Sequence, residues 1–515
     1  MNHSIEKKYG ERYKVIRNRM RKFDTSDFIH IVLTHLRWPV AAGRLEAEKM
    51  PWIALLAIKW ALADPEAFAK GRATPSKNDV YKVMDDIYQI GDVGYMPDDF
   101  ADVHLFMKAM AVQQFYLQFG PALHRINRQL FLFGDLPKDH RLAIEFKKIT
   151  KVDINQYLIC SALLMLHYND PNTAAIDIEQ YKATMGQAFS HEDIDAFLAS
   201  LTTTFDNAVA VIRTRDQLIR DAGGLPRSPL EFFEQSYFQR YPFLMLDSKP
   251  TCIERHLLYR SLEYVVFDRL REIAAETFME DFGPVFERYV EMYIRHARLD
   301  FYTELQLRDH YKPKQGTKEI DFVITEKEGN VFVDAKGIEL HYEGKVALTF
   351  EQQIKWYKTS LTKAVVQAHD ALRMINDSTR PALVRSVSAN YLIVVTYKEL
   401  YVGHGVRLID VIGQDAFDVL VAPYEESLRI HPSHMYFMTI DEFEMLMCAV
   451  EEGKTTVVGS LELSKAADQS PQTGTYDYSQ HLTKQGIHGC FASFSKQKFR
   501  DVAAQFIQIP KQLDI

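Results

Sequence analysis

Two aspartates and a lysine in the stretch EIDFVITEKEGNVFVDAKG are spaced so that they can act together. Side chains two residues apart in a β-strand share a face, so Asp334 and Lys336 point the same way from the segment VFVDAK. If the turn is centred between Lys327 and Glu328, Asp321 lies directly opposite Asp334. The β-carbons of such a cross-strand pair are about 5 Å apart. The spacing therefore predicts two neighbouring carboxylates with an ammonium group beside them.

This arrangement predicts a divalent cation, because like charges directly opposite one another destabilise a hairpin. Mg²⁺ prefers hard oxygen ligands and typically takes one or two carboxylates together with waters and phosphate oxygens. A cation here would neutralise a phosphate, lower the pKa of a bound water and orient that water for in-line attack. Close to a dication, Lys336 is expected to have a depressed pKa and to help position or deprotonate the water.

An acidic residue two positions before a lysine is by itself a weak signal, since roughly five such triplets are expected in a chain of this composition. The triplet at 145–147 sits in a helical pattern, where residues two apart do not share a face. The triplets at 343–345 and 452–454 fall in glycine turns with no strand in front. Only the triplet at 334–336 ends an apolar strand and has a partner aspartate in hairpin register. A surface hairpin closed by a salt bridge is the alternative interpretation.

These motifs resemble the signature of the PD-(D/E)xK nuclease superfamily, which has the restriction-endonuclease-like fold. That signature is a helix bearing a glutamate, a strand, a strand with an aspartate, a strand ending in (D/E)xK, and a helix that often carries Lys or Gln. The matching segments are GPVFERYVE (Glu287), EIDFVI (Asp321), VFVDAKG (Asp334 and Lys336) and SLTKAVVQA (Lys363 and Gln367). The resemblance covers about residues 235 to 450. Ile320 stands where the family often has proline, and the middle acid is Asp rather than Glu; neither departure removes a ligand.

The resemblance implies a Mg²⁺- or Mn²⁺-dependent nuclease, most naturally acting on DNA and serving in bacterial restriction or anti-phage defence. It implies that Asp321, Asp334 and the backbone carbonyl of Ala335 bind the metal, while Lys336 assists the attacking water. Glu287 would contact the metal through water, or would only pair with Arg288 or a solvent cation. The residues with implied catalytic roles are Asp321, Asp334, Lys336, Glu287 and Gln367. Lys363 and Gln367 share a helix face, which either contacts phosphate or is simply a polar surface.

The elements that must position these residues begin with two segments of helical periodicity, ERHLLYRSLEYVVFDRLREIAAETF and GPVFERYVEMYIRHARL. The second opens after Gly283 with Pro284 in its first turn, a favoured place for proline. FYTELQL, EIDFVITE and NVFVDAKG are then expected to be strands, because they are short and rich in β-branched and aromatic residues. Glu304, in the first of them, is a further candidate acid.

A helix around SLTKAVVQAHDALRMI, a buried central strand at 391–397 and a last strand MYFMT follow. The last strand leads into a capping box, from Thr439 to Glu442, that starts another helix. The order of helix, three strands, helix, two strands and helix predicts a mixed α/β domain in which a mixed sheet is flanked by helices.

The N-terminal part has helical periodicity from about residue 25 to 222, and the Gly- and Pro-containing stretch at 221–229 is the best candidate linker. We therefore expect a large all-α domain at 1–222 that serves recognition, regulation or assembly. A nuclease-like domain is expected at 223–452 and a C-terminal extension at 453–515. The helical domain is the expected site of contact with a partner protein or with further copies of the chain.

Composition limits the remaining choices. The net charge of −8 disfavours a global polyanion-binding surface, so any nucleic-acid contact must use local patches such as the basic segments at 7–22 and 308–318. Each of these is either a phosphate contact or a solvated face. Four dispersed cysteines, no signal-peptide core and no long apolar run favour a cytoplasmic protein that has no membrane partner.

Other functions stay open or are disfavoured. No P-loop, GxSxG or HExxH motif is present, which disfavours an ATPase, a serine hydrolase and a zinc protease. A non-catalytic nucleic-acid-binding or assembly subunit with a nuclease-like fold is the alternative from another class. RNA is the alternative substrate, because backbone contacts carry no sequence information and recognition of the 2′-hydroxyl leaves no short motif.

Overall fold

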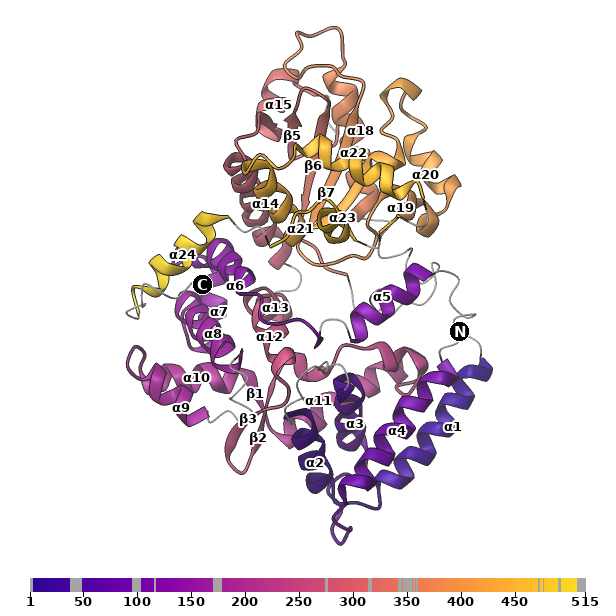
Figure 1. Cartoon of the computed structure of the whole chain (residues 1–515), viewed down its shortest axis with the longest axis vertical. Helices are drawn as coiled ribbons and strands as arrows, with labels where there is room; N and C mark the ends of the chain where they lie inside the picture. Colours follow the sequence, from indigo (N-terminus) through magenta and orange to yellow (C-terminus); the bar gives the residue numbers. More distant parts are fainter. Residues whose placement is uncertain are drawn as a thin grey trace. The chain divides into compact units, whose positions relative to one another are not determined.

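The structure is a computed structural model that describes residues 3–37, 49–94, 103–114, 117–169, 178–273, 277–313, 317–340, 345, 354, 357, 360–470, 473–475, 477–489 and 492–506. It divides into two compact units. Unit 1 is Met1–Ile273 with Lys496–Ile515, and unit 2 is Ala274–Ser495. Each contains helices and a β-sheet (Figure 1), which confirms the predicted mixed α/β class.

Unit 2 is built on a five-stranded mixed sheet with the strand order β4-β5-β6-β7-β8. The pairs β4–β5 and β5–β6 are antiparallel, and the pairs β6–β7 and β7–β8 are parallel. The strands are β4 (Phe301–Thr303), β5 (Phe322–Thr325), β6 (Asn330–Lys336), β7 (Asn390–Thr396) and β8 (Met435–Thr439). The helices are α14 (Phe278–His296), α15 (Glu304–Tyr311), α18 (Ser360–Ile375), α19 (Gly405–Ile412), α20 (Gln414–Val421), α21 (Ile440–Glu451), α22 (Val457–Asp468) and α23 (Tyr478–Lys484). Short 3₁₀ turns are η7 (Glu426–Leu428) and η8 (Pro432–His434).

Alternation along the strands assigns side chains to the two faces of this sheet. Phe332 of β6 and Leu392 of β7 belong to a buried cluster with α15, α18, α19 and α20. Because side chains two apart share a face, Asp334 and Lys336 lie on the face of Phe332, toward α18. The opposite face meets α14 and α21 to α23, where Tyr436 of β8 packs edge-on against Tyr478. Helices therefore flank the sheet as expected.

Two local predictions about unit 2 are wrong. Helix α14 begins at Phe278, not after Gly283, and Pro284 lies inside it. Phe278, Phe282 and Phe286 stack at helical spacing and are fully buried, so packing outweighs the hydrogen bond that proline removes. The expected strand FYTELQL stops at Thr303 and continues as helix α15.

The sequence contains a local signal that explains why α15 is helical. Thr303 and Gln306 form a reciprocal capping box, which satisfies backbone N–H groups at the start of α15. Glu304 and Arg308 are spaced one turn apart, which also stabilises a short helix. The second predicted capping box, Thr439 with Glu442 at the start of α21, is confirmed.

Unit 1 is mostly helical. Its longer helices are α1 (His3–Met20), α2 (Thr25–Arg37), α3 (Pro51–Ala63), α4 (Lys77–Gly94), α5 (Val103–Gln113), α8 (Ile154–Asn169), α10 (His191–Leu201) and α11 (Phe205–Asp221). Shorter helices are α6 (Leu123–Gln129), α7 (Arg141–Thr150), α9 (Ile178–Met185), α12 (Arg255–Glu263) and α13 (Val265–Ile273). A short π-helix, η4 (Leu130–Gly134), and two 3₁₀ turns, η5 (Pro229–Phe233) and η6 (Tyr237–Gln239), complete the list. Helix α24 (Ser493–Ala503) begins in unit 2 and continues in unit 1.

The expected all-α domain at 1–222 is corrected in two respects. A small sheet is present, in which β1 (Thr202–Thr203) pairs with β2 (Phe243–Leu246) and β2 pairs with β3 (Lys249–Cys252). The unit also extends to Ile273, so residues 223–273 do not belong to the sheet domain.

The stretch 221–229 does not act as a linker, because ion pairs tie it into unit 1. Arg227 pairs with Asp216 at 2.6 Å and with Glu231 at 2.8 Å, and all three side chains are largely buried. The expected C-terminal extension at 453–515 is divided as well: α22 and α23 complete unit 2, and the chain from Lys496 onward belongs to unit 1.

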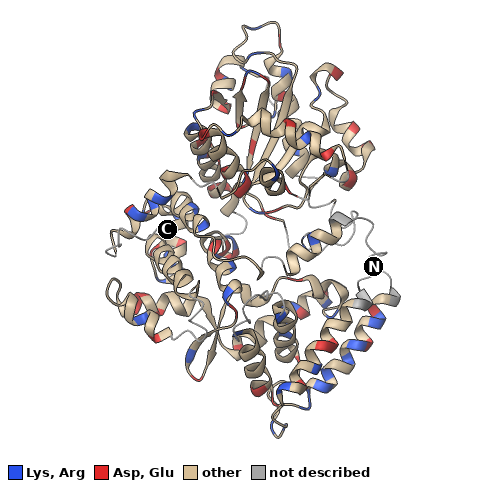
Figure 2. Cartoon of the chain, in the orientation of Figure 1, with Lys and Arg blue, Asp and Glu red and all other residues tan. Residues whose placement is uncertain are grey.

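The basic segment at 7–22 forms α1, and much of its charge is used within unit 1. Arg19 pairs with Asp86 of α4, Arg12 donates to the carbonyl of Gln89, and Arg21 pairs with Asp64 at 2.9 Å. Figure 2 shows basic and acidic residues side by side on α1 and α4. This pairing favours the solvated-face interpretation over a dedicated phosphate contact.

No single helix in the described ranges is both long enough and apolar enough to cross a membrane, although α7 and α8, bent by 55° at their junction, meet the criteria as a pair. Cys160 and Cys252 are free thiols. Cys490 lies outside the described residues, as do residues 314–316 of the second basic segment.

Candidate active site

The hairpin of β5 and β6 has the register expected from the sequence. Phe322 pairs with Val333 and Thr325 with Asn330, so one further step of the same ladder sets Asp321 opposite Asp334. The backbone N–H of Ala335 donates to Asp321 Oδ2 over 2.6 Å. This bond fixes the Asp321 carboxylate at the end of β6, and the predicted register is confirmed.

A polar cluster lies where β6 meets α18. Asp334 is fully buried, and Lys336 Nζ donates to Asp334 Oδ1 over 2.9 Å and to Gln367 Oε1 over 3.0 Å. Gln367 in turn donates from Nε2 to the carbonyl of Glu319, so α18 is tied to the segment that carries Asp321. Asp334 Oδ2 lies 2.7 Å from Lys336 Nζ, but no described group makes a hydrogen bond to it with suitable angles. Lys336 therefore compensates the buried Asp334 carboxylate through an ion pair that uses both of its oxygens.

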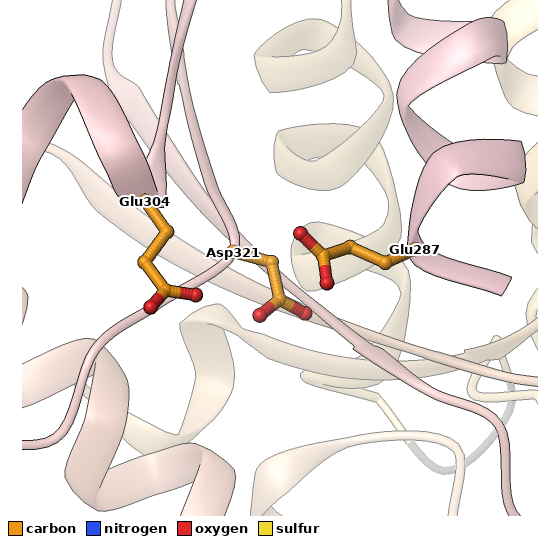
Figure 3. A group of neighbouring side chains, drawn as sticks. All are labelled: Glu287, Glu304 and Asp321. Carbon is orange, nitrogen blue, oxygen red and sulfur yellow. The ribbon is translucent and has the colours of Figure 1, made fainter. Parts of the chain in front are cut away.

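Three carboxylates converge beside this cluster (Figure 3). Glu287 comes from α14, Glu304 from the first turn of α15 and Asp321 from the segment before β5. One oxygen of each side chain lies within 4.8 Å of the others, and all three side chains are half-buried. Glu304 was expected in a strand, but the capped helix start is what turns its carboxylate toward the other two.

The structure therefore brings most of the predicted site residues together. Glu287, Asp321, Asp334, Lys336 and Gln367 all contribute to this region. Asp334 is not part of the converging trio, since its carboxylate is turned to Lys336. The contact of Ala335 with the site is made by its N–H. Roles for Asp334 and for the carbonyl of Ala335 as metal ligands stay predictions.

Burial and neighbouring negative charge raise the pKa values of the three converging carboxylates, Glu287, Glu304 and Asp321. Burial, followed by the charge of Asp334, raises the pKa of Asp321 to about 8, against the Ala335 N–H and Lys336. Burial also raises the pKa of Asp334, although Lys336 opposes the shift. The pKa of Glu287 is raised by burial first and then by Glu291. The site thus holds negative charge at a cost that a bound cation would offset.

Glu304 has additional partners on its exposed side. Arg308 of α15 pairs with Glu304 and with Glu319, whose oxygens lie 2.9 Å from Arg308 Nε and 2.6 Å from its NH2 group. Burial, and then hydrogen bonding to Glu319, raises the pKa of Glu304 to about 7. Sequence reasoning missed Glu319 and Arg308. The Thr303–Gln306 capping box is the signal that would have revealed α15 and the spacing of Glu304 to Arg308.

Lys363 lies on α18 one turn before Gln367 and is exposed. Its charge is one of those that lower the pKa of Asp334, so it stands near the site without a described contact to it. Gln367 is buried and bonded on both ends of its amide. Of the two α18 residues, Gln367 is part of the polar cluster and Lys363 borders it.

No protein-family model, curated protein or solved structure matches this chain. The chemistry of the donor set is therefore the basis for assigning a function. Hard carboxylate oxygens converge here within a few ångströms, and the basic residue in described contact with them is Arg308. Such a donor set fits Mg²⁺ or Mn²⁺ better than a soft metal.

Proposed function

We propose that this chain is a divalent-metal-dependent nuclease of the PD-(D/E)xK kind, acting on DNA. The observation that carries the proposal is the β5–β6 register, which sets Asp321 beside the Asp334-Ala335-Lys336 end of β6. Random acidic triplets lack such a partner. A role in restriction or anti-phage defence is the biological setting that the resemblance implies.

The architecture of unit 2 supports a restriction-endonuclease-like fold. A helix bearing Glu287 precedes an antiparallel β4–β5–β6 meander, and α18 then connects β6 to the parallel strand β7. The inserted helix α15 does not interrupt the pairing of β4 with β5. These are the elements that the resemblance requires, in the required order.

Glu287, Glu304 and Asp321 would hold the cation, with Asp334 next to them. When bound, Mg²⁺ or Mn²⁺ supplies charge neutralisation for a phosphate and acidifies a coordinated water. The fit rests on the converging carboxylates, with the buried carboxylate of Asp334 beside them.

Lys336 is the group placed to act on the substrate. An ammonium has three donors, of which Asp334 Oδ1 and Gln367 Oε1 take two. Asp334 Oδ2 is also 2.7 Å from Lys336 Nζ, so a phosphate oxygen or a water molecule would compete with that contact for the third donor. The side chain of Lys336 is 16% exposed, so it is reachable from solvent while Asp334 and Gln367 fix its direction. A donor that is already held in place stabilises the negative charge that develops on the substrate in the transition state.

The test is a cleavage assay on plasmid DNA, single-stranded DNA and RNA, with Mg²⁺, with Mn²⁺ or with EDTA. We expect cleavage of DNA by the wild-type protein only with the metal. Lys336→Met should lower the rate by about 10²- to 10⁴-fold, the range for a positioned proton-transfer group. The matched control is Lys454→Met, since Lys454 pairs with Glu452 in another acid-x-Lys triplet of unit 2 and its side chain is 48% exposed.

Each outcome decides between the candidate functions. Cleavage of RNA alone would replace DNA by RNA as the substrate. Binding of nucleic acid without cleavage under either metal would favour the non-catalytic subunit. Equal cleavage by wild type and Lys336→Met would overturn the proposed site.

A further inference from the structure

We infer that Arg308 is a positioning residue that holds Glu304 in place as a metal ligand; the inference rests on the proposed function. Arg308 contacts two carboxylates at once, Glu304 on its own helix and Glu319 in the segment before Asp321. It is the described basic residue in direct contact with the acidic trio.

The guanidinium of Arg308 links Glu304 to Glu319. Two of its nitrogens reach the two oxygens of Glu319, at 2.9 Å and 2.6 Å, and NH2 also reaches Glu304. A bidentate guanidinium sets direction as well as charge, which an ammonium cannot do. Glu319 is itself anchored, since its backbone carbonyl accepts from Gln367. A continuous chain of contacts therefore runs from Lys336 through Gln367, Glu319 and Arg308 to Glu304.

Arg308 is expected to contribute little to the stability of the fold. Its side chain is 50% exposed and lies on the outer side of a short helix that already has a capping box. Exposed ion pairs contribute little to stability, because solvent screens them. A role in orienting Glu304 accounts for two converging ion pairs at this point better than a stabilising role does.

The two interpretations of Arg308 predict opposite signs for cation affinity. A bystander arginine repels a dication, so its removal should strengthen binding. A positioning arginine holds a ligand in reach, so its removal should weaken binding although repulsion is relieved. Outer partners of metal ligands commonly change affinity by about 10- to 100-fold.

The experiment measures Mn²⁺ binding to the full-length protein by calorimetry, for wild type, Arg308→Met and Arg308→Lys. We expect Kd for Mn²⁺ to rise by about 10- to 100-fold in Arg308→Met. Arg308→Lys keeps the charge and loses the fork, so it should also weaken binding, by several-fold. Arg373→Met is the matched control, because Arg373 pairs with Asp370 at 2.7 Å and has a nearly equal exposure of 51%; its Kd should stay unchanged.

Thermal unfolding without metal separates folding from binding, and all four proteins should melt at nearly the same temperature. Unchanged or tighter Mn²⁺ binding in both Arg308 variants would overturn the inference, while the proposed function would stand. Failure of the wild-type protein to bind Mn²⁺ would instead overturn the proposed function. An equal loss of affinity in Arg373→Met would also overturn the inference, since the loss would then not depend on the contact of Arg308 with Glu304.

Discussion

The two units treat buried acidic residues in opposite ways. In unit 1, Glu263 is fully buried but lies between Arg125 and Arg260, and Glu231 contacts both Lys59 and Arg227. In unit 2, Glu287 and Asp321 face each other and Glu304, and the nearby cation Lys336 is turned to Asp334. The first arrangement is complete within the chain. In the second, the three carboxylates face one another, and the proposed cation would supply the missing positive charge.

The pKa shifts of the buried groups in the two units differ in the same way. Burial alone would lower the pKa of Lys59, but Glu231 and Glu234 outweigh it and raise that pKa. Burial raises the pKa of Asp321 to about 8, and Asp334 adds to the shift instead of opposing it. Active sites often contain a group whose pKa is shifted both by burial and by a neighbouring group of like charge. Charge compensation, more than burial, distinguishes the two regions.

The largest effect is expected from neutralising a compensated acid in unit 1. Glu263→Gln leaves Arg125 and Arg260 without their carboxylate, and breaking such a buried pair costs about 3–5 kcal/mol. Chemical denaturation measures the loss. Glu145→Gln, which breaks an exposed pair with Lys148, is the control and should change stability by less than about 1 kcal/mol. Equal effects of the two variants would remove the distinction drawn for unit 1.

The same change of charge in the site should have the opposite sign. Asp321→Asn keeps an acceptor for the Ala335 N–H but removes repulsion from Asp334. Without metal at pH 8, we expect Tm to rise by about 2–4 °C, the shift that corresponds to 1 kcal/mol in a unit of this size. Mn²⁺ should stabilise the wild-type protein and not this variant. A lower Tm for metal-free Asp321→Asn would show that its charge is compensated after all.

The pH dependence of stability sharpens the comparison further. The pKa of Asp321 in the folded protein, about 8, lies above its ordinary value, so folding favours the neutral carboxyl. Its contribution is therefore complete below about pH 4 and is lost as the pH rises through about 8. Metal-free wild type should lose Tm over this range, and Asp321→Asn should lose less. Parallel curves for the two proteins would contradict the raised pKa of Asp321.

The smallest effect is expected at Gln367, which positions Lys336 without facing the converging carboxylates. Gln367→Ala removes the acceptor for Lys336 and the donor to the Glu319 carbonyl, so kcat should fall by about 10-fold. Gln367→Glu restores the acceptor alone and should recover part of the rate. No recovery, together with a reduced Tm, would indicate that Gln367 only holds α18 in place.

Local patterns were sufficient for several elements of unit 2. Apolar alternation and the turn at 328–330 determine the β5–β6 register, and the helical periodicity from Ser360 to Ile375 gives α18 with its observed bounds. The capping box of Thr439 and Glu442 predicts the start of α21. Where local signals conflicted, the tertiary context decided. The aromatic stack of α14 carries the helix through Pro284, and a capping box converts a β-like segment into α15.

The sequence by itself determined which residues form the hairpin and that Asp321, Asp334 and Lys336 share one end of it, because strand alternation and turn position depend on neighbouring residues only. The tertiary structure decided that Glu287 and Glu304 join Asp321, that Gln367 holds Lys336, and that residues 223–273 belong to unit 1. These outcomes depend on packing between segments distant in the chain. Short-range periodicity carries no information about such contacts, whereas burial and charge compensation in the folded chain select them.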